Sequence, residues 1–381
     1  MLKCKRKIGI NMMGYKIMRL KETPLWKKIV KVILILVLIV VVLFGGLIAA
    51  LAITEYKPAA RENLKITGNG NKKINTNVPI KVMTWNVGYC GLGAEEDFFM
   101  DGGKETQPSS QARVKRNLKS IQKFIKKENP DTVFLQEVDR NGTRTGHLNE
   151  VQSIQDKMKG YDSAFAQNFK VLFIPYPFPP MGKEDSGIVT LSKYDISKAT
   201  RISLPCPFTG ISRMGNLKRC LLVSRTKVEG TDKELVFVNL HLEAYDNGEG
   251  KKAQSAMLQD FLQKEYAKGN YVLAGGDFNQ VFDSADSSNY PIVKDGVWKP
   301  GKLSTEDYTN NWSFMMDSNV PSCRSLDKRY EKGISPVEFQ FYMIDGFIVS
   351  DNISVESVET QDLQFANSDH NPVELKMTLK D

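Results

Sequence analysis

The sequence has few of the residues that bind soft metal ions. It holds five cysteines, and no two of them form a Cys-x-x-Cys pair, which argues against a zinc site of that type. We expect the cysteines to be structural thiols rather than catalytic ones. In an oxidising compartment, Cys90, Cys206, Cys220 and Cys323 would allow two disulfides in three alternative pairings, whereas Cys4 lies apart near the N-terminus. Histidine is rarer still, with three copies, so a histidine inside a motif is informative.

Charged residues are absent from positions 32–53, which are nearly all apolar. A run of this length predicts one transmembrane helix. Residues 1–31 carry ten Lys or Arg and one Glu, and the positive side of a span stays cytoplasmic, so we expect a basic cytoplasmic tail, a single-pass anchor in the cell membrane and an extracellular body. The alternative is a cleaved signal peptide ending near Ala50-Leu51-Ala52. The apolar run and the basic segment before it are both long for a signal peptide, which favours the anchor.

The rest of the chain lacks an excess of positive charge. The whole chain has a net charge of +8, but residues 32–381 hold 42 Lys or Arg against 43 Asp or Glu, hence −1. Domains that bind nucleic acid usually present a basic surface. The charge therefore weakens the case for a nucleic-acid substrate without excluding it.

The chain after the apolar run divides into two parts. Residues 54–78 are polar and rich in Gly and Asn, which predicts a flexible stalk. Residues 79–381 are enough for one large α/β domain. The apolar period predicts helices at 112–128 and 253–262, while residues 283–340 are expected to be irregular. Short apolar runs indicate a mixed sheet with strands at 80–85, 132–135, 187–191, 220–228, 235–241, 271–274, 343–349 and 373–377.

Polar residues recur beside these apolar runs. Burying them is costly unless they pair with one another or with a metal, so we expect them to meet at one site. The stretches, in chain order, are Trp85-Asn86, Gln136-Glu137, Asn239-Leu240-His241-Leu242, Gly276-Asp277-Phe278-Asn279, Ile344-Asp345 and Ser368-Asp369-His370-Asn371-Pro372.

These stretches, in this order, resemble the motifs of the endonuclease/exonuclease/phosphatase superfamily, also called deoxyribonuclease I-like, from about Ile80 to Leu379. The resemblance implies a four-layer α/β sandwich, in which two mixed β-sheets pack together and helices flank them. It also implies hydrolysis of a phosphodiester or phosphomonoester by in-line attack of water. The implied cofactor is Mg²⁺, with Mn²⁺ as an alternative, and hard oxygen ligands suit such ions.

The resemblance also implies roles for single residues. Asp345 orients the imidazole of His370, and a carboxylate partner raises the basicity of a histidine. The residues expected to bind the metal are Asn86, Glu137 and Asp369. The residues expected to be catalytic are His241, Asp277, Asn279, Asp345 and His370.

Several residues also allow an ordinary structural role in place of a functional one. Glu137 taken alone would be a strand-end carboxylate in a salt bridge with Arg140, and a lone histidine is usually structural. His147 is expected on a surface loop. Arg144 is expected to be solvated, with a phosphate contact as the alternative. Residues 175–180, Pro-Tyr-Pro-Phe-Pro-Pro, predict either a stiff connector or an aromatic rim that touches substrate or lipid.

Taken together, the sequence predicts a membrane-anchored, divalent-metal-dependent phosphoesterase. The sequence does not distinguish among nucleic acid, phospholipid and sugar phosphate as the substrate. The alternative from another class is a non-catalytic surface-binding module on a decayed enzyme fold. Decay should have removed a metal ligand or a histidine, whereas every motif position is filled here.

Overall fold

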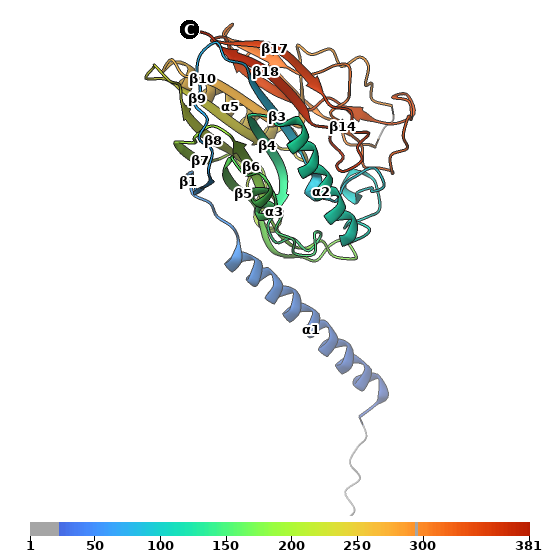
Figure 1. The fold of residues 1–381 in the computed structure, drawn as a ribbon. Coiled ribbons are helices and arrows are strands. Elements are labelled where there is room, and N and C mark those ends of the chain that lie inside the picture. Colours follow the sequence, from blue (N-terminus) through green and yellow to red (C-terminus); the bar gives the residue numbers. More distant parts are fainter. Residues whose placement is uncertain (1–22, 294–295) are drawn as a thin grey trace, which may run out of the picture. The chain divides into compact units, whose positions relative to one another are not determined.

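The computed structural model describes residues 23–293 and 296–381 (Figure 1). The chain forms two units, residues 1–50 and residues 51–381, and each is described by itself. The expected basic tail falls mostly on residues 1–22 and lies outside the described residues.

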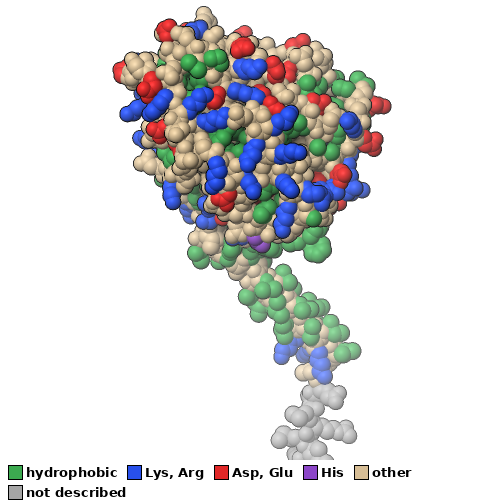
Figure 2. Space-filling model, viewed as in Figure 1, with side chains coloured by type: hydrophobic (Ala, Val, Ile, Leu, Met, Phe, Trp, Pro, Cys, Tyr) green, Lys and Arg blue, Asp and Glu red, His purple; other side chains and the backbone are tan. Residues whose placement is uncertain are grey.

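The first helix, α1 (Leu25–Thr54), contains the whole run for which a transmembrane span was expected. Apolar side chains cover its surface, with Lys and Arg gathered near its start (Figure 2). It is long and apolar enough to cross a membrane. It begins seven residues before position 32, because residues 25–31 hold no Gly or Pro that would break a helix.

Two seven-stranded sheets form the body. The first sheet has the order β1 (Arg61–Asn63), β7 (Lys198–Ser203), β8 (Cys220–Lys227), β9 (Glu234–His241), β10 (Tyr271–Asp277), β16 (Asp345–Ser350) and β13 (Trp312–Met315). The second has the order β17 (Ile353–Thr360), β18 (Val373–Leu379), β3 (Ile80–Asn86), β4 (Thr132–Asp139), β6 (Gly182–Ser192), β5 (Asp162–Ile174) and β2 (Ile66–Gly68). Both sheets mix parallel and antiparallel pairs.

Smaller elements surround the two sheets. Two short pairs are β11 (Gln280–Phe282) with β12 (Gly301–Leu303), and β14 (Cys323–Arg324) with β15 (Phe341–Tyr342). The helices of the body are α2 (Gln111–Glu128), α3 (Glu150–Lys157), α4 (Gly210–Met214) and α5 (Glu249–Tyr266), with single 3-10 turns η1 (Gly88–Cys90) and η2 (Phe99–Asp101).

Hydrophobic packing arranges these elements in four layers, which confirms the expected architecture. Between the sheets, the rings of Phe134 on β4 and Phe237 on β9 meet edge to face, with centroids 6.0 Å apart. The outer face of the first sheet packs on α5 through Leu258 and Leu262. The outer face of the second sheet packs on α2 and α3. Burial of these faces supplies most of the driving force for the fold.

Local signals explain where the two long helices of the body start and stop. The Ser110 hydroxyl accepts a hydrogen bond from the Arg113 N–H, which satisfies a free donor at the start of α2. Asn129 adopts the left-handed conformation that ends it. The second expected helix, residues 253–262, lies within α5, which continues to Tyr266 before Gly269 turns the chain.

Residues 54–78 were wrongly expected to be a flexible stalk. β1 pairs with β7, and β2 pairs with β5, so this segment extends both sheets. Ile74 is buried between the sheets. An outer strand leaves unpaired N–H and C=O groups that a further strand can satisfy whatever its side chains. The ordered body therefore begins before residue 79.

Other differences from expectation concern strands near sheet edges. β5, β7 and β17 were not predicted, and residues 283–340, expected to be irregular, contain β12, β13 and β14. Of these, β5, β7 and β17 mix polar and apolar residues because one face of each is partly exposed, as the alternating exposure of β17 shows.

Candidate active site

Strand ends from both sheets meet at one edge of the body. β9 and β10 are parallel, so their last residues, His241 and Asp277, are neighbours. Asp345, the first residue of antiparallel β16, pairs with Asp277. In the other sheet, β3 ends at Asn86, beside Gln136 on parallel β4. Parallel strands bring their C-terminal ends to the same edge, which gathers polar groups that are far apart in the chain.

Strand alternation explains how buried polar groups reach this edge. On β9, Phe237, Asn239 and His241 share one face, which turns towards the other sheet. Gln136 Nε2 donates to Asn239 Oδ1 at 2.8 Å, and Asn239 Nδ2 donates to the Val189 carbonyl at 2.8 Å. These bonds join the two sheets at Asn239, two residues before His241 on the same face of β9.

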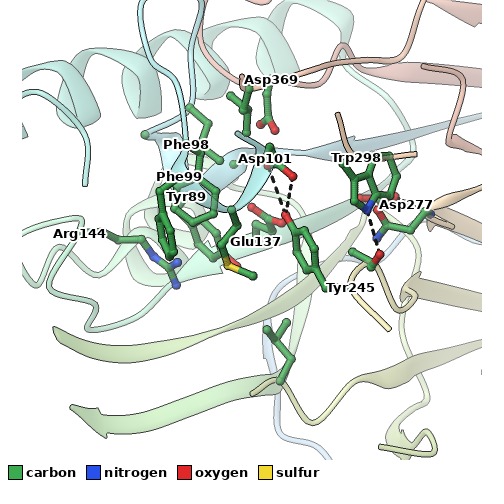
Figure 3. A pocket seen from close by; sticks show the side chains of 18 of the residues that line it. Tyr89, Phe98, Phe99, Asp101, Glu137, Arg144, Tyr245, Asp277, Trp298 and Asp369 are labelled. Atoms are coloured by element: carbon green, nitrogen blue, oxygen red, sulfur yellow. Dashed lines mark hydrogen bonds between the residues drawn. The ribbon is translucent and has the colours of Figure 1, made fainter. Parts of the chain in front are cut away.

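A local break in β4 redirects Glu137. The pairing of β4 with β6 shifts between Leu135 and Val138, and Glu137 has a φ of 55°. Such a bulge turns a side chain away from the regular alternation of the strand. Glu137 consequently points into the cavity at the sheet edge (Figure 3).

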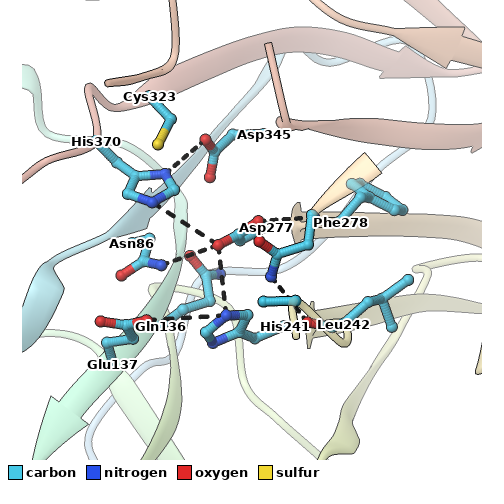
Figure 4. A network of polar contacts seen from close by, with 12 residues as sticks. Asn86, Gln136, Glu137, His241, Leu242, Asp277, Phe278, Cys323, Asp345 and His370 are labelled. Carbon is cyan, nitrogen blue, oxygen red and sulfur yellow. Dashed lines mark hydrogen bonds and ion pairs between the residues drawn. The ribbon is translucent and has the colours of Figure 1, made fainter. Parts of the chain in front are cut away.

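Asp277 is the centre of the polar network (Figure 4). Its Oδ2 accepts a hydrogen bond from Asn86 Nδ2 at 3.0 Å, and its Oδ1 accepts the Asn279 N–H at 2.8 Å. Nε2 of His241 lies 3.4 Å from Oδ2, and Nε2 of His370 lies 3.8 Å from it. Burial, and next the charge of Asp345, raise the pKa of Asp277 to about 6, although His370 and Asn86 oppose that rise.

His370 and Asp345 form a buried ion pair. His370 Nδ1 lies 2.8 Å from Asp345 Oδ2, which also accepts the Ser322 hydroxyl at 2.8 Å. Trp85 Nε1 donates to the backbone carbonyl of His370 at 2.9 Å and fixes its position. Burial alone would lower the pKa of His370, but Asp345 outweighs it and holds that pKa well above the usual value.

His241 has the opposite electrostatic character. Burial lowers its pKa well below the usual value, and the positive charges of Arg219 and His370 lower it further. Its Nε2 also lies 3.8 Å from Glu137 Oε1, while its Nδ1 has no hydrogen-bond partner among the described residues. The site thus holds one histidine that favours the protonated form and one that favours the neutral form, a division suited to acid-base chemistry.

Glu137 and Asp369 are two cavity-lining carboxylates that could hold a divalent cation. Removal from water raises the pKa of Glu137 to about 8, and the charge of Asp369 is the next largest cause. The pKa of Asp369 is also raised, first by burial. Asn86 Oδ1 accepts one hydrogen bond, from the Gly88 N–H, which leaves capacity for a second contact. Two mutually repelling carboxylates and an amide oxygen are the donors that Mg²⁺ prefers.

Two clusters of side chains that could hold a metal ion occur among the described residues. One combines Asp277, Asp345 and His370, and the other combines Cys323, Asp369 and His370. In the first, Nδ1 of His370 is already engaged by Asp345. Glu137 and Asp369, which line the same cavity, offer further hard oxygen ligands of the kind that Mg²⁺ prefers.

The network forms part of the wall of a cavity of about 430 Å³. Figure 3 shows Glu137, Asp277 and Asp369 beside aromatic side chains in this cavity. The aromatic and apolar lining comes from separate segments and includes Tyr89, Phe98, Phe99, Met100, Tyr176, Phe208 and Trp298. Charged groups against apolar walls suit a ligand with one ionic and one apolar part.

Sequence analysis missed a pair of residues that face each other in this cavity. The Tyr245 hydroxyl contacts Asp101 Oδ1 at 3.1 Å, linking the segment after β9 to η2 (Figure 3). Loss of water contact raises the pKa of Asp101 to about 7. Asp101 belongs to an acidic, Gly-rich stretch, and composition alone cannot show which of its carboxylates turns inward.

Arg144 was expected to be solvated, and this was wrong. Its guanidinium is buried in ion pairs with Asp139, at 3.2 Å, and with Glu184, and it stacks 3.3 Å from the centre of the Tyr89 ring. His147 is exposed, as expected. The salt bridge considered between Arg140 and Glu137 does not form, because Arg140 Nε pairs with Asp185 at 3.3 Å.

Two glycines allow close approaches at the site. Gly88 has a φ of 52°, and a Cβ there would lie 2.6 Å from Asp369 Oδ1. Gly276 has a φ of 149°, and a Cβ there would lie 2.0 Å from the Leu240 carbonyl oxygen. Any side chain at Gly276 would separate β9 from β10 and move His241 away from Asp277.

The four cysteines of the body are free thiols. Burial raises the pKa of Cys90, Cys220 and Cys323, which keeps these thiols protonated. Of the two alternatives for the thiols of the body, free or paired, the structure therefore shows the free form. Cys4 lies outside the described residues.

Comparison with known proteins agrees with this geometry. The model of the Endonuclease/Exonuclease/phosphatase family matches residues 83–370. A solved endonuclease/exonuclease/phosphatase from Beutenbergia cavernae is 17% identical with a TM-score of 0.53, over 79% of this chain and 72% of that one. One from Bacteroides vulgatus is 17% identical with a TM-score of 0.50, over 80% of this chain and 100% of that one. A search of curated proteins gave no match.

Proposed function

Since the chain belongs to the endonuclease/exonuclease/phosphatase family, whose members hydrolyse phosphoester bonds, we propose that it is a membrane-anchored, divalent-metal-dependent phosphoesterase. The observation that supports this best is the network around Asp277, which joins Asn86, His241 and His370 at the cavity that Glu137 and Asp369 also line. A binding module would have no need of this costly burial of charge.

Glu137, Asp369 and Asn86 are the residues that would hold the cation. Mg²⁺ suits their oxygen donors, and Mn²⁺ is the alternative. When bound, it would neutralise charge on the phosphoryl oxygens.

The other residues would handle the water and the protons. Asp277, whose Oδ2 faces both histidines, would orient the attacking water. His370, kept protonated by Asp345, would donate to a phosphoryl oxygen. His241 would remain neutral and able to exchange a proton. Asn279, whose Nδ2 donates one bond to the Leu242 carbonyl, would use its second N–H for the phosphate.

We also propose that α1 crosses the cell membrane once, with the N-terminus cytoplasmic and the catalytic body outside. The support is the helix itself and the ten Lys or Arg in residues 1–31. The net charge of −1 over residues 32–381 favours a phospholipid or sugar-phosphate substrate over nucleic acid.

The test compares two histidines in the purified full chain. His370→Ala should lower Mg²⁺-dependent hydrolysis of bis(p-nitrophenyl) phosphate by about a hundredfold or more, because it removes a charged donor from the site. His147→Ala, on an exposed loop, should leave the rate unchanged. Circular dichroism checks that both variants fold.

Retained activity in His370→Ala would refute the catalytic assignment. Absence of hydrolysis and of Mg²⁺ or Mn²⁺ binding in the wild type would instead favour the non-catalytic binding module. If the wild type does hydrolyse the model substrate, assays with DNA, phospholipid vesicles and inositol phosphates separate the substrate classes.

A further inference from the structure

The end of β5 and the connection from β5 to β6 expose large apolar side chains. Leu172, Phe173, Tyr176 and Phe178 are all exposed, and Phe178 is 94% exposed. Apolar side chains gathered on a protein surface mark an interaction site. Side chains of this kind lie along the lower margin of the body in Figure 2.

A second exposed apolar residue stands on α4. Ile211 is exposed, and two cations of the same segment, Arg213 and Lys218, lie 3.4 and 3.6 Å from Glu55 Oε1. The next residue, Tyr56, donates its hydroxyl to the Gln167 carbonyl on β5 at 3.4 Å. Residues 55–56 are therefore held against both α4 and β5.

This attachment restricts where the body lies if α1 spans a membrane. α1 ends at Thr54, and the next residue, Glu55, already contacts Arg213 and Lys218. No flexible linker therefore separates the proposed span from residues 213–218. A residue immediately after a span lies in the headgroup region. The surface around Glu55 must then face the bilayer.

The same segments help to line the cavity of the candidate site. Its lining includes Ile174 at the end of β5, Tyr176 and Met181 of the β5–β6 connection, and Phe208 and Leu217 on either side of α4. Tyr176 is both 72% exposed and part of the lining, so the exposed apolar surface continues into the cavity.

We infer that residues 172–178 and Ile211 form a docking rim that inserts into the bilayer that α1 spans. Aromatic and amphipathic side chains such as Phe178 and Tyr176 favour the membrane interface. The inference rests on the proposed anchor and deepens the proposed function, because the rim turns the cavity towards the lipid headgroups. It favours a phosphoester carried by a membrane lipid over a soluble nucleic acid.

A direct test measures membrane contact without using activity. The full chain is reconstituted in phosphatidylcholine vesicles whose acyl chains carry bromine, which quenches nearby tryptophan. The emission added by Phe178→Trp should be strongly quenched. The emission added by Val78→Trp should not, because Val78 precedes β3 at the end opposite Asn86 and the site.

A second test uses the reaction. Phe178→Asp should lower hydrolysis of vesicle phospholipid about tenfold, since it replaces an apolar anchor by a charge, while Val78→Asp should not. Phe178 is not among the residues that line the cavity, so hydrolysis of a soluble phosphodiester by the same variant reports whether the site is assembled.

The outcomes separate the two proposals. Quenching in a protein that hydrolyses nothing would support the rim and overturn the proposed function. An active enzyme in which Phe178→Trp and Val78→Trp behave alike would overturn the rim and point to a protein partner for this surface. A full chain that does not float with vesicles would overturn the anchor, and the rim with it.

Discussion

At the scale of single residues, two arginines four positions apart show how burial determines what an ion pair contributes to stability. Arg140 pairs with the largely buried Asp185, and 39% of the Arg140 side chain is exposed. Arg144 neutralises Asp139 and Glu184, whose side chains are fully buried. An ion pair whose arginine is solvated contributes little to stability, whereas removal of a buried arginine leaves its partners with uncompensated charge.

Arg144→Ala should therefore lower the free energy of unfolding by about 3 kcal/mol or more. Arg140→Ala, the matched control, should change it by less than about 1 kcal/mol. Urea denaturation followed by circular dichroism measures both values. Equal effects in the two variants would show that Arg144 is not the charge that holds Asp139 and Glu184.

At the scale of elements, the segment between α1 and β3 belongs to the folded body. β1 and β2 add to opposite sheets, and the chain between β2 and β3 buries Ile74 against both. Because this segment contributes to two layers, its attachment should affect the stability of the whole body.

Ile74→Ala should destabilise the protein by about 2–4 kcal/mol, the usual range for a large aliphatic side chain removed from a packed core. Lys73→Ala, next to it, loses only an exposed ion pair with Glu229 and serves as the control. Thermal unfolding measures the difference. A melting temperature unchanged in Ile74→Ala would instead support the expectation that residues 54–78 form a flexible stalk.

At the scale of the whole molecule, the candidate site combines groups from both sheets. Asn86 and Glu137 come from the second sheet, whereas His241, Asp277 and Asp345 come from the first. A cation at this edge would relieve repulsion between Glu137 and Asp369, a cost that the folded protein otherwise carries.

Mg²⁺ should therefore stabilise the folded chain, by about 2.7 kcal/mol when its concentration is a hundred times its dissociation constant. The melting temperature should rise with Mg²⁺ in the wild type and fall again with a chelator. Glu137→Gln should abolish the rise, and Glu331→Gln, on an exposed loop, should keep it. A rise of the same size in Glu137→Gln would place the cation elsewhere.

Much of the fold followed from patterns within short stretches. The apolar period placed α2 within one residue of its observed start, and apolar runs located β3, β9 and β18. For the site, the resemblance put Asp345 beside His370, and the structure finds them 2.8 Å apart. The outer strands β1 and β2 were missed because their order comes from a neighbouring strand and not from their own side chains.

The sequence by itself determined the apolar span, the order of the motifs and the residue types of the site, since each depends on neighbours within a few positions. Only the tertiary structure decided which charges are buried, because burial depends on residues distant in the chain. Neither the burial of Arg144 nor the contact of Asp101 with Tyr245 could be read from local sequence. The exposed aromatics of residues 172–178 became significant only because residues 55–56 are held against β5 and α4. A local pattern determines which secondary structure a residue favours, whereas the packing of the two sheets determines which residues surround it.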